Sequence, residues 1–254
     1  MKSDYDRISR TLADVPLVFL NYGFADPDAG PPAWIEDVDR SNRHHLALVR
    51  KVLDGAALEG KTVLEVGCGR GGNCSYIARY ENASRVLGID RCTPSIAFCS
   101  RMHRIPNVRF IVGSAERLPV RDASIDVILN LESAHCYERF DVFLSEVRRV
   151  LRPGGLFRFA DVWDWAVLPC DWKRREVDLA ASGLVVESEH DISRGVLEAL
   201  EREDGFHATL ASVTVPAGGP LIRRLIRGAD ALRSSLTLGL CRYRAWHMRK
   251  PGRI

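Results

Sequence analysis

A glycine-rich turn with an acidic residue on either side is the clearest chemical signal in this chain of 254 residues. A short apolar strand is predicted over 62–66, and it runs into the glycines of 67–72. Glycine lets a backbone approach a ligand closely, and the helix predicted over 73–80 offers free N–H groups at its start. Asp90 ends the next predicted strand, where a carboxylate can accept hydrogen bonds from ribose hydroxyls. The pattern predicts a nucleoside site.

The glycine spacing alone leaves two nucleoside ligands open. Gly67, Gly69 and Gly72 also satisfy the GxGxxG fingerprint of dinucleotide-binding proteins. Glu65, however, lies inside the first strand, where a pyrophosphate gains nothing from a nearby negative charge. A ligand that carries an ammonium and a sulfonium would gain from it. We therefore favour a cationic nucleoside, with an NAD-binding oxidoreductase as the less favoured alternative.

A second group of reactive side chains lies just after the fourth and fifth predicted strands. His135 is the candidate general base, because an unperturbed imidazole titrates near pH ~6.5; its alternative role is to orient a partner. Glu132 either lines the site or caps the next helix. Asp161 ends the fifth strand and either faces the substrate or caps the next segment of the chain. These three residues are the predicted catalytic residues.

Strands that alternate with helices predict a parallel sheet covered on both faces. The predicted strands are 62–66, 85–89, 108–112, 125–131 and 156–160, followed by 184–187 and a final edge strand over 242–248. The predicted helices are 41–53, 73–80, 94–103, 140–151, 172–181, 192–203 and 221–232.

We interpret residues 1–254 as a single domain with four parts. These are an N-terminal lid segment (1–40), a core that binds the nucleoside (41–189), a helical cap insertion (190–240), and a final strand with a tail (241–254). The lid contains the Pro/Gly-rich loop ADPDAGPP, which could serve as a hinge, and Tyr22, which either folds over the ligand or anchors the segment in the core. Three tryptophans after the fifth strand either line an apolar pocket or fill core: Trp163, Trp165 and Trp172.

The composition excludes several other classes. A formal net charge of +3 does not by itself predict a nucleic-acid partner. The seven cysteines are odd in number and show no CxxC pair, which argues against a metal site or a disulfide framework. The chain shows no signal-peptide h-region and no apolar run of about 18 residues. We expect a cytoplasmic protein without stable membrane insertion that acts on a small molecule, and the sequence leaves a homodimer open.

Four segments over residues 60–160 together resemble the class I methyltransferases. Residues 65–69 (EVGCG) resemble their motif I, Asp90 matches their ribose-binding acid, residues 113–119 (GSAERLP) resemble the GDAExLPF segment beside the adenine, and residues 150–155 (VLRPGG) resemble the turn into the fifth strand. Ser114 stands where the family usually has the Asp that bonds the adenine amino group.

The resemblance implies a Rossmann-like fold with a mostly parallel seven-stranded sheet, helices on both faces, an N-terminal helical lid and a helical insertion near the C-terminus. It implies S-adenosyl-L-methionine as the methyl donor and S-adenosyl-L-homocysteine as the product. Together with the residue patterns, it predicts a set of donor-binding residues: Tyr22, Glu65, Gly67, Cys68, Gly69, Asn73, Asp90, Arg91, Ser114, Ala115, Glu116, Asn130 and Leu131.

Further segments are similar to the mycobacterial phthiotriol/phenolphthiotriol dimycocerosate methyltransferases and to related actinobacterial natural-product methyltransferases. These segments are 19–23 (FLNYG), 41–43 (SNR), 129–137 (LNLESAHCY) and 159–161 (FAD). This resemblance implies O-methylation of a hydroxyl on a lipophilic molecule, such as a polyketide or lipid. An N- or C-methyltransferase of a natural product is the alternative, and a non-catalytic donor-binding subunit is less favoured.

Overall fold

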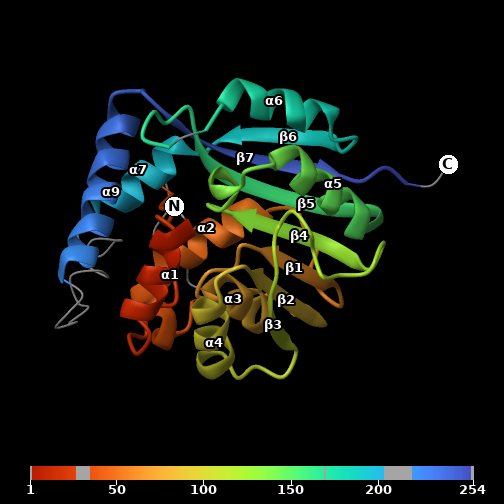
Figure 1. The fold of residues 1–254 in the computed structure, drawn as a ribbon, viewed down its shortest axis with the longest axis horizontal. Coiled ribbons are helices and arrows are strands. Elements are labelled where there is room, and N and C mark those ends of the chain that lie inside the picture. The colour runs from red at the N-terminus through yellow and green to blue at the C-terminus, as the bar shows by residue number, and fades with distance from the viewer. Residues whose placement is uncertain (1, 27–34, 169, 203–218, 253–254) are drawn as a thin grey trace.

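The fold is a twisted seven-stranded sheet in the order β3-β2-β1-β4-β5-β7-β6 (Figure 1). The computed structural model describes residues 2–26, 35–168, 170–202 and 219–252. Its strands are β1 (Thr62–Val66), β2 (Arg85–Asp90), β3 (Val108–Val112), β4 (Ile125–Leu131), β5 (Leu151–Trp163), β6 (Val185–Asp191) and β7 (Arg242–Arg249). Strands β1 to β5 pair in parallel, and β7 is antiparallel to both of its neighbours. The predicted Rossmann-like fold is confirmed.

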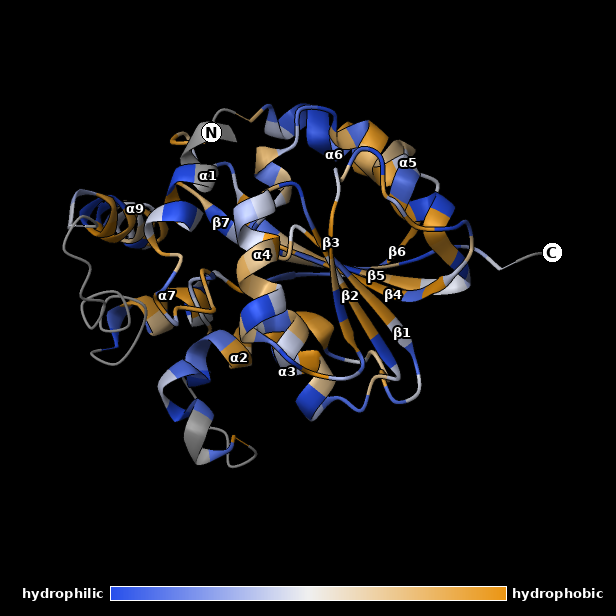
Figure 2. Cartoon of the chain, turned by 60° about the horizontal axis from the view of Figure 1, so that its bottom comes forward, coloured by the Kyte–Doolittle hydropathy of each residue, from blue (hydrophilic) through white to orange (hydrophobic). Residues whose placement is uncertain are grey.

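The helices pack against both faces of the sheet. They are α1 (Lys2–Thr11), α2 (Arg43–Leu53), α3 (Gly72–Tyr80), α4 (Thr93–Met102), α5 (Phe140–Val150), α6 (Trp172–Ala181), α7 (Ser193–Glu201) and α9 (Gly219–Thr237), with 3-10 turns at Asp37–Asn42 and Ala134–Cys136. Two apolar cores result: α2 and α3 bury residues such as Val49 and Ile77 on one face, and α5 buries Phe143 and Val147 on the other. Figure 2 shows the strands lying between these two layers.

The predicted edge position of the last strand is wrong. Strand β7 lies inside the sheet, with β5 on one side and β6 on the other. Its Tyr243, Ala245 and Met248 are buried, as an internal strand requires. The edge strand on this side of the sheet is β6, whose residues are almost all exposed and largely charged or polar. Charged side chains on an edge strand oppose pairing with a second sheet.

Strand β5 is longer than the predicted 156–160 and starts directly after α5. Its extra residues pair with β4 at Leu151 and with β7 up to Trp163. Asp161 therefore lies within the strand and not at its end. Helix α2 begins at Arg43, because residues 37–42 form a 3-10 turn where the sequence predicted the first helical residues. Helix α7 ends at Glu201, and α9 is longer than the predicted 221–232.

Helices α1, α7 and α9 gather at the end of the sheet where the parallel strands finish (Figure 1). Helices α7 and α9 lie between β6 and β7 in the sequence, within the predicted insertion. Most of the Pro/Gly-rich loop, from residue 27 onward, lies outside the described residues. Among the helices that are described, none is long and apolar enough to cross a membrane.

Candidate active site

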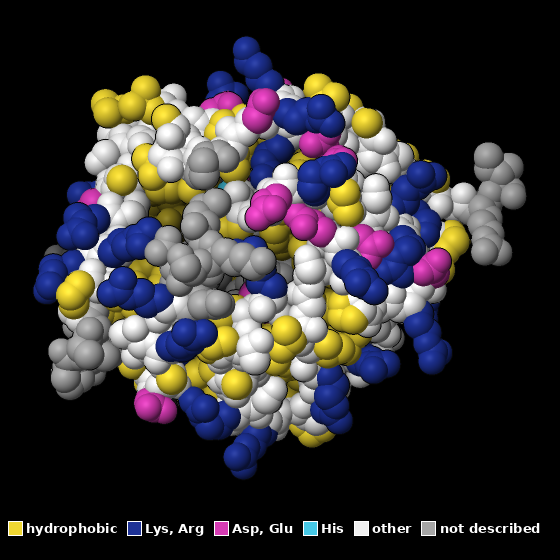
Figure 3. All heavy atoms as spheres, in the orientation of Figure 1, with side chains coloured by type: hydrophobic (Ala, Val, Ile, Leu, Met, Phe, Trp, Pro, Cys, Tyr) yellow, Lys and Arg dark blue, Asp and Glu magenta, His cyan; other side chains and the backbone are white. Residues whose placement is uncertain are grey.

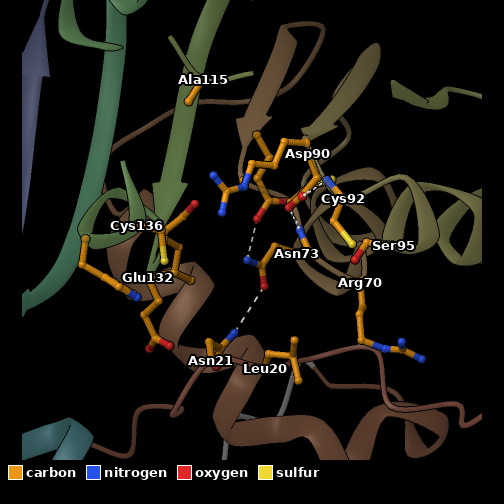
Figure 4. A pocket seen from close by; sticks show the side chains of 18 of the residues that line it. Leu20, Asn21, Arg70, Asn73, Asp90, Cys92, Ser95, Ala115, Glu132 and Cys136 are labelled. Atoms are coloured by element: carbon orange, nitrogen blue, oxygen red, sulfur yellow. Dashed lines mark hydrogen bonds between the residues drawn. The ribbon is translucent and has the colours of Figure 1, made fainter. Parts of the chain in front are cut away.

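A cavity of about 620 Å³ opens at the carboxyl ends of β1, β2, β4 and β5. This volume falls within the range of sites that enclose a small molecule. In Figure 4, Asp90 stands on one side of the cavity, while Glu132 and Cys136 stand on the other. We refer to these two sides as the donor end and the acceptor end.

Two glycines of the turn after β1, Gly67 and Gly69, serve different purposes. Both have a left-handed backbone, with φ of 76° at Gly67 and 49° at Gly69. A Cβ atom added to Gly67 would lie 1.8 Å from the Ser133 hydroxyl oxygen, so the chain itself fills the space there. A Cβ at Gly69 would meet nothing within 4 Å. Gly69 is therefore the position where the backbone leaves room beside the cavity.

Asp90 is fixed by the two loops that surround it. Its Oδ2 accepts the Gly69 N–H at 2.9 Å, and its Oδ1 accepts the Cys92 N–H at 2.8 Å. An ionised carboxylate has about four acceptor sites, so these bonds orient Asp90 and leave capacity for further donors. The carboxylate lines the cavity, as a ribose-binding acid must.

Glu65 is a buried carboxylate that lines the same cavity with only 1% of its surface exposed. Its hydrogen-bond donors are neutral: the Asn73 amide at 2.7 Å and the Cys74 thiol at 2.9 Å. Burial raises the pKa of Glu65 to about 7, against the opposing effect of these hydrogen bonds. A cationic ligand would stabilise the ionised form, so this end of the cavity fits a ligand with an ammonium or a sulfonium group.

The segment after β3 also borders the donor end. The Ser114 hydroxyl oxygen accepts the Glu116 N–H at 3.2 Å, and this leaves its own O–H available as a donor. Glu116 accepts the Arg139 N–H and so ties this segment to the start of α5. Each predicted donor-binding residue lines the cavity, with one exception.

The exception is Asn130, which does not line the cavity. Its side chain is fully buried, and its amide donates to the Val66 carbonyl at 2.8 Å and to the Tyr137 hydroxyl at 2.9 Å. The resemblance implied a ligand contact, but the amide instead links β4 to β1. Contact between Asn130 and the donor is therefore withdrawn from the prediction.

His135 and Asp161 form a hydrogen-bonded pair at the acceptor end. The His135 Nδ1 donates to the Asp161 Oδ1 at 2.8 Å, and the His135 backbone N–H donates to Oδ2 at 3.0 Å. The carboxylate is 1% exposed and also accepts the Val162 N–H. With Nδ1 engaged as a donor, Nε2 is left to accept a proton. Asp161 thus orients His135 and also lines the cavity.

The electrostatics of the pair favour the protonated imidazole. Burial opposes the charge on His135, but the adjacent Asp161 carboxylate outweighs it and raises the pKa of His135 well above 6.5. A base with a raised pKa accepts a proton more strongly, but it is available only at higher pH. The positive charge of a sulfonium ligand would act in the opposite direction.

Glu132 stands beside this pair and connects three parts of the chain. Its Oε1 accepts the Tyr22 N–H at 3.1 Å and the Tyr243 hydroxyl at 2.7 Å. Burial raises its pKa to about 7. Its φ of 49° is unusual for a residue with a side chain, and such strain is found at functional sites. Glu132 holds the N-terminal segment and caps no helix in the part of the chain described.

Residues 18–22 of the N-terminal segment close one side of the cavity. The Asn21 amide donates to Asn73 at 3.3 Å, and Asn73 donates in turn to Glu65, as the dashed lines in Figure 4 show. The Asn21 oxygen is bonded to the His45 ring at 3.0 Å. The sequence patterns predicted Tyr22 as a candidate site residue but did not predict Asn21 or Tyr243. Asn21 could have been found, because it lies in the motif 19–23 (FLNYG). No pattern near Tyr243 indicated its contact with Glu132.

Apolar side chains complete the acceptor end. Trp165 and Leu168 come from the loop after β5, and Leu225 and Gly228 come from one face of α9. The Trp165 indole N–H donates to Ser235 of the same helix at 3.1 Å. Trp163, in contrast, is fully buried and packs on Trp246 with ring centroids 4.7 Å apart. The pocket interpretation therefore holds for Trp165, and the core interpretation holds for Trp163.

The α/β fold thus carries one cavity that holds a buried carboxylate, Glu65, which suits a cation, and a histidine oriented by Asp161. A family profile described as a methyltransferase domain matches residues 64–159. Over 199 residues the chain is 42% identical to a fatty-acid O-methyltransferase of Mycolicibacterium smegmatis, covering 78% of this chain and 70% of that protein. Over 214 residues it is 38% identical to a phthiotriol/phenolphthiotriol dimycocerosates methyltransferase of Mycobacterium tuberculosis, covering 84% and 77%.

Solved structures support the fold at lower identity. The geranyl diphosphate C-methyltransferase of Streptomyces coelicolor superposes with a TM-score of 0.69 at 18% identity, covering 97% of this chain and 98% of that one. The [4+2]-cyclase SpnF gives 0.72 at 19%, covering 99% and 94%. Because one of these is a cyclase, the fold alone does not fix the reaction. The identities with the mycobacterial enzymes show that the chain belongs to the methyltransferases, and S-adenosylmethionine is its methyl donor.

Replacing Asp90 with alanine is expected to weaken the binding of S-adenosylhomocysteine by about 1.5–3 kcal/mol, because the variant loses charge-assisted acceptors. This corresponds to roughly a 10- to 150-fold higher Kd. Isothermal titration calorimetry measures the change. Asp122→Asn is the control, since Asp122 is an exposed partner of Arg149 remote from the turn. An unchanged Kd for Asp90→Ala would place the nucleoside elsewhere.

Proposed function

We propose that this enzyme transfers the methyl group of S-adenosylmethionine to a hydroxyl of a lipophilic small molecule. The observation that carries this proposal is an oriented histidine, His135, beside an apolar wall that includes Trp165 and Leu225. A neutral hydroxyl must lose its proton during transfer, so it needs a base. The names of the mycobacterial relatives, which concern fatty acids and phthiotriol lipids, support a lipid-like acceptor.

The proposed division of labour corresponds to the two ends of the cavity. Asp90 would hold the ribose, Glu65 would face the cationic amino-acid part, and Ser114 with Ala115 would border the adenine. The bound donor supplies an activated methyl on a sulfonium, with a neutral thioether as the leaving group. The chain's own task is to align the acceptor and exclude water.

His135 would take the proton from the acceptor hydroxyl at Nε2 as the methyl transfers. Asp161 would hold the ring in the required tautomer and stabilise the imidazolium that forms. Glu132 would add a second negative charge beside that imidazolium. The catalytic roles predicted for these three residues thus become one base and two groups that support it.

Residues 1–40 would form a lid over the donor, and residues 190–240 a cap over the acceptor. We further propose a cytoplasmic enzyme with a small-molecule partner and no nucleic-acid partner. In support of the last point, the Lys and Arg side chains on the face shown in Figure 3 are scattered among acidic and apolar ones and form no continuous stripe. A homodimer remains compatible with the proposal.

A direct test uses S-adenosylmethionine labelled in its methyl group and a matched set of acceptors. The set holds one long alkyl chain with a hydroxyl, a carboxyl or an amine at its end, together with hydroxylated polyketides. The proposal predicts label in the hydroxylated members and loss of that label in His135→Ala. Label only in amines, with full activity in His135→Ala, would establish N-methylation in place of the proposed reaction.

Gly228→Leu is expected to reduce kcat/KM for long-chain acceptors by about tenfold or more, because the new side chain enters the acceptor end. Gly228 lines the cavity, and a Cβ placed there meets nothing within 4 Å. Leucine also favours the helix over glycine by roughly 0.8–1 kcal/mol, so α9 should remain folded. Gly228→Ala is the matched control and should stay within a few-fold. Unchanged kinetics in Gly228→Leu would exclude α9 as an acceptor wall.

A further inference from the structure

Arg70 is a buried cation in the donor turn whose partners all lie in the N-terminal segment or on α4. It comes directly after Gly69 and is 1% exposed. Its Nη2 donates to the Leu12 carbonyl at 2.9 Å and to the Val15 carbonyl at 2.8 Å, and its Nε donates to the Leu17 carbonyl. Arg70 borders the cavity, but in Figure 4 the end of its side chain points away from it. Its role therefore differs from that of the residues that face a ligand.

The Arg70 guanidinium is held by stacking as well as by hydrogen bonds. Its central carbon lies 3.5 Å from the centroid of the Phe98 ring on α4. Burial lowers the pKa of Arg70 to about 10, which leaves it charged at neutral pH. Its three hydrogen-bond acceptors are backbone carbonyls, and arginine alone offers the planar fork of donors that can serve several acceptors at once.

The neighbouring backbone of the donor turn contacts the same segment. The Gly72 N–H donates to the Val18 carbonyl at 3.2 Å. A Cβ added to Gly72 would lie 2.7 Å from that oxygen and 2.6 Å from the Phe19 ring, so no larger residue fits between them. The donor turn and residues 12–19 therefore pack as one unit.

The chain next reaches the residues that close the cavity. Asn21 bonds to Asn73, the partner of Glu65, and the Tyr22 N–H bonds to Glu132. Asn21 lies only four positions beyond Leu17, which Arg70 holds. A shift of the segment at Leu17 would therefore move both contacts.

We propose that Arg70 is the positioning residue that clasps residues 12–18 onto the donor turn and so holds Asn21 and Tyr22 in place over the cavity. The inference rests on the proposed donor site for its functional consequence. The Arg70 guanidinium would thus control donor affinity through the N-terminal segment that it holds.

The test compares Arg70→Lys with Arg101→Lys. A lysine at position 70 keeps the charge but cannot reproduce the fork. Arg101 is a matched control, because it donates to the Ala13 carbonyl of the same segment from an exposed position. Hydrogen exchange is measured on the donor-free proteins at the amides of Tyr22, Gly23 and Phe24, each of which is hydrogen-bonded in the structure. Donor affinity is then measured by calorimetry with S-adenosylhomocysteine, and KM and kcat by steady-state kinetics.

For Arg70→Lys we expect exchange at these three amides to accelerate at least tenfold, while amides of β1 and β4 keep their rates. The Kd for S-adenosylhomocysteine and the KM for the donor should rise at least tenfold, with kcat at saturating donor within a few-fold. Arg101→Lys should change each value less than twofold. Unchanged exchange at the three amides would overturn the clasp, and faster exchange with unchanged donor affinity would overturn its link to the donor site. If the wild-type protein bound no S-adenosylhomocysteine, the proposed function would fail, while the exchange rates would still decide whether the clasp exists.

Discussion

The variant His135→Ala is expected to lower kcat by about 10²–10⁴-fold, the range that a positioned general base contributes. Affinity for S-adenosylhomocysteine should change only a few-fold, because His135 adjoins Cys136, which stands on the side of the cavity away from Asp90. His135→Gln keeps a polar side chain but cannot take up the proton at neutral pH, and it should be nearly as slow. Single-turnover rates at saturating donor separate this loss from any change in product release.

The pH dependence of the wild-type rate gives the same claim an independent readout. Only the neutral imidazole can accept a proton, so the rate should rise with pH and then level off. Because Asp161 raises the pKa of His135, the increase in rate should occur above pH 6.5. A flat profile, together with both variants within a few-fold of wild type, would exclude His135 as the base.

Asp161→Asn should be the second most damaging change, with a loss of kcat of about 10²-fold or more, inside the range set by the base itself. An asparagine amide can donate to Nδ1, and it would then favour the tautomer in which Nε2 carries the proton and cannot accept another. Loss of the carboxylate also removes the attraction that raises the pKa of His135. The rise in the pH–rate profile should therefore move to lower pH.

Rate profiles for wild type, Asp161→Asn and the control Asp141→Asn measure this effect. Asp141 pairs with Arg139 at the exposed start of α5, away from the cavity, and its replacement should leave both kcat and the profile unchanged. If the rate of Asp161→Asn increases at the same pH as the wild-type rate, the group that titrates is not His135. Glu132 would then be the first candidate, since burial raises its pKa to about 7.

Local sequence patterns predicted the strands that form the centre of the sheet. The bounds of β1 and β4 agree with the predicted ranges, because strands buried on both faces read as largely apolar runs between turn residues. The bounds of β3, which lies at one edge of the sheet, agree as well. The position of β7 depends instead on pairing with β5, some 90 residues away, and on the charged β6 taking the edge. No local pattern encodes such an order, which explains the incorrect edge prediction.

The same limit applies to the site. The glycine turn and Asp90 lie close in sequence, so their spacing predicted one end of a common cavity. The pairing of His135 with Asp161 joins residues 26 positions apart, and that of Tyr243 with Glu132 joins residues 111 apart. These long-range contacts determine the role of each side chain in the site, and no local sequence pattern predicts them. Asn130 illustrates the complementary limit, because Leu131 beside it lines the cavity and Asn130 does not.

The central claim is that one cavity binds the donor at Asp90 and presents its methyl group to an acceptor hydroxyl that lies beside His135. A crystal structure of the protein with S-adenosylhomocysteine tests this claim most directly. We predict the ribose hydroxyls within hydrogen-bond distance of the Asp90 carboxylate, the amino-acid part beside Glu65, and the sulfur directed toward His135. A nucleoside bound away from Asp90, or a sulfur that points away from His135, would contradict the account.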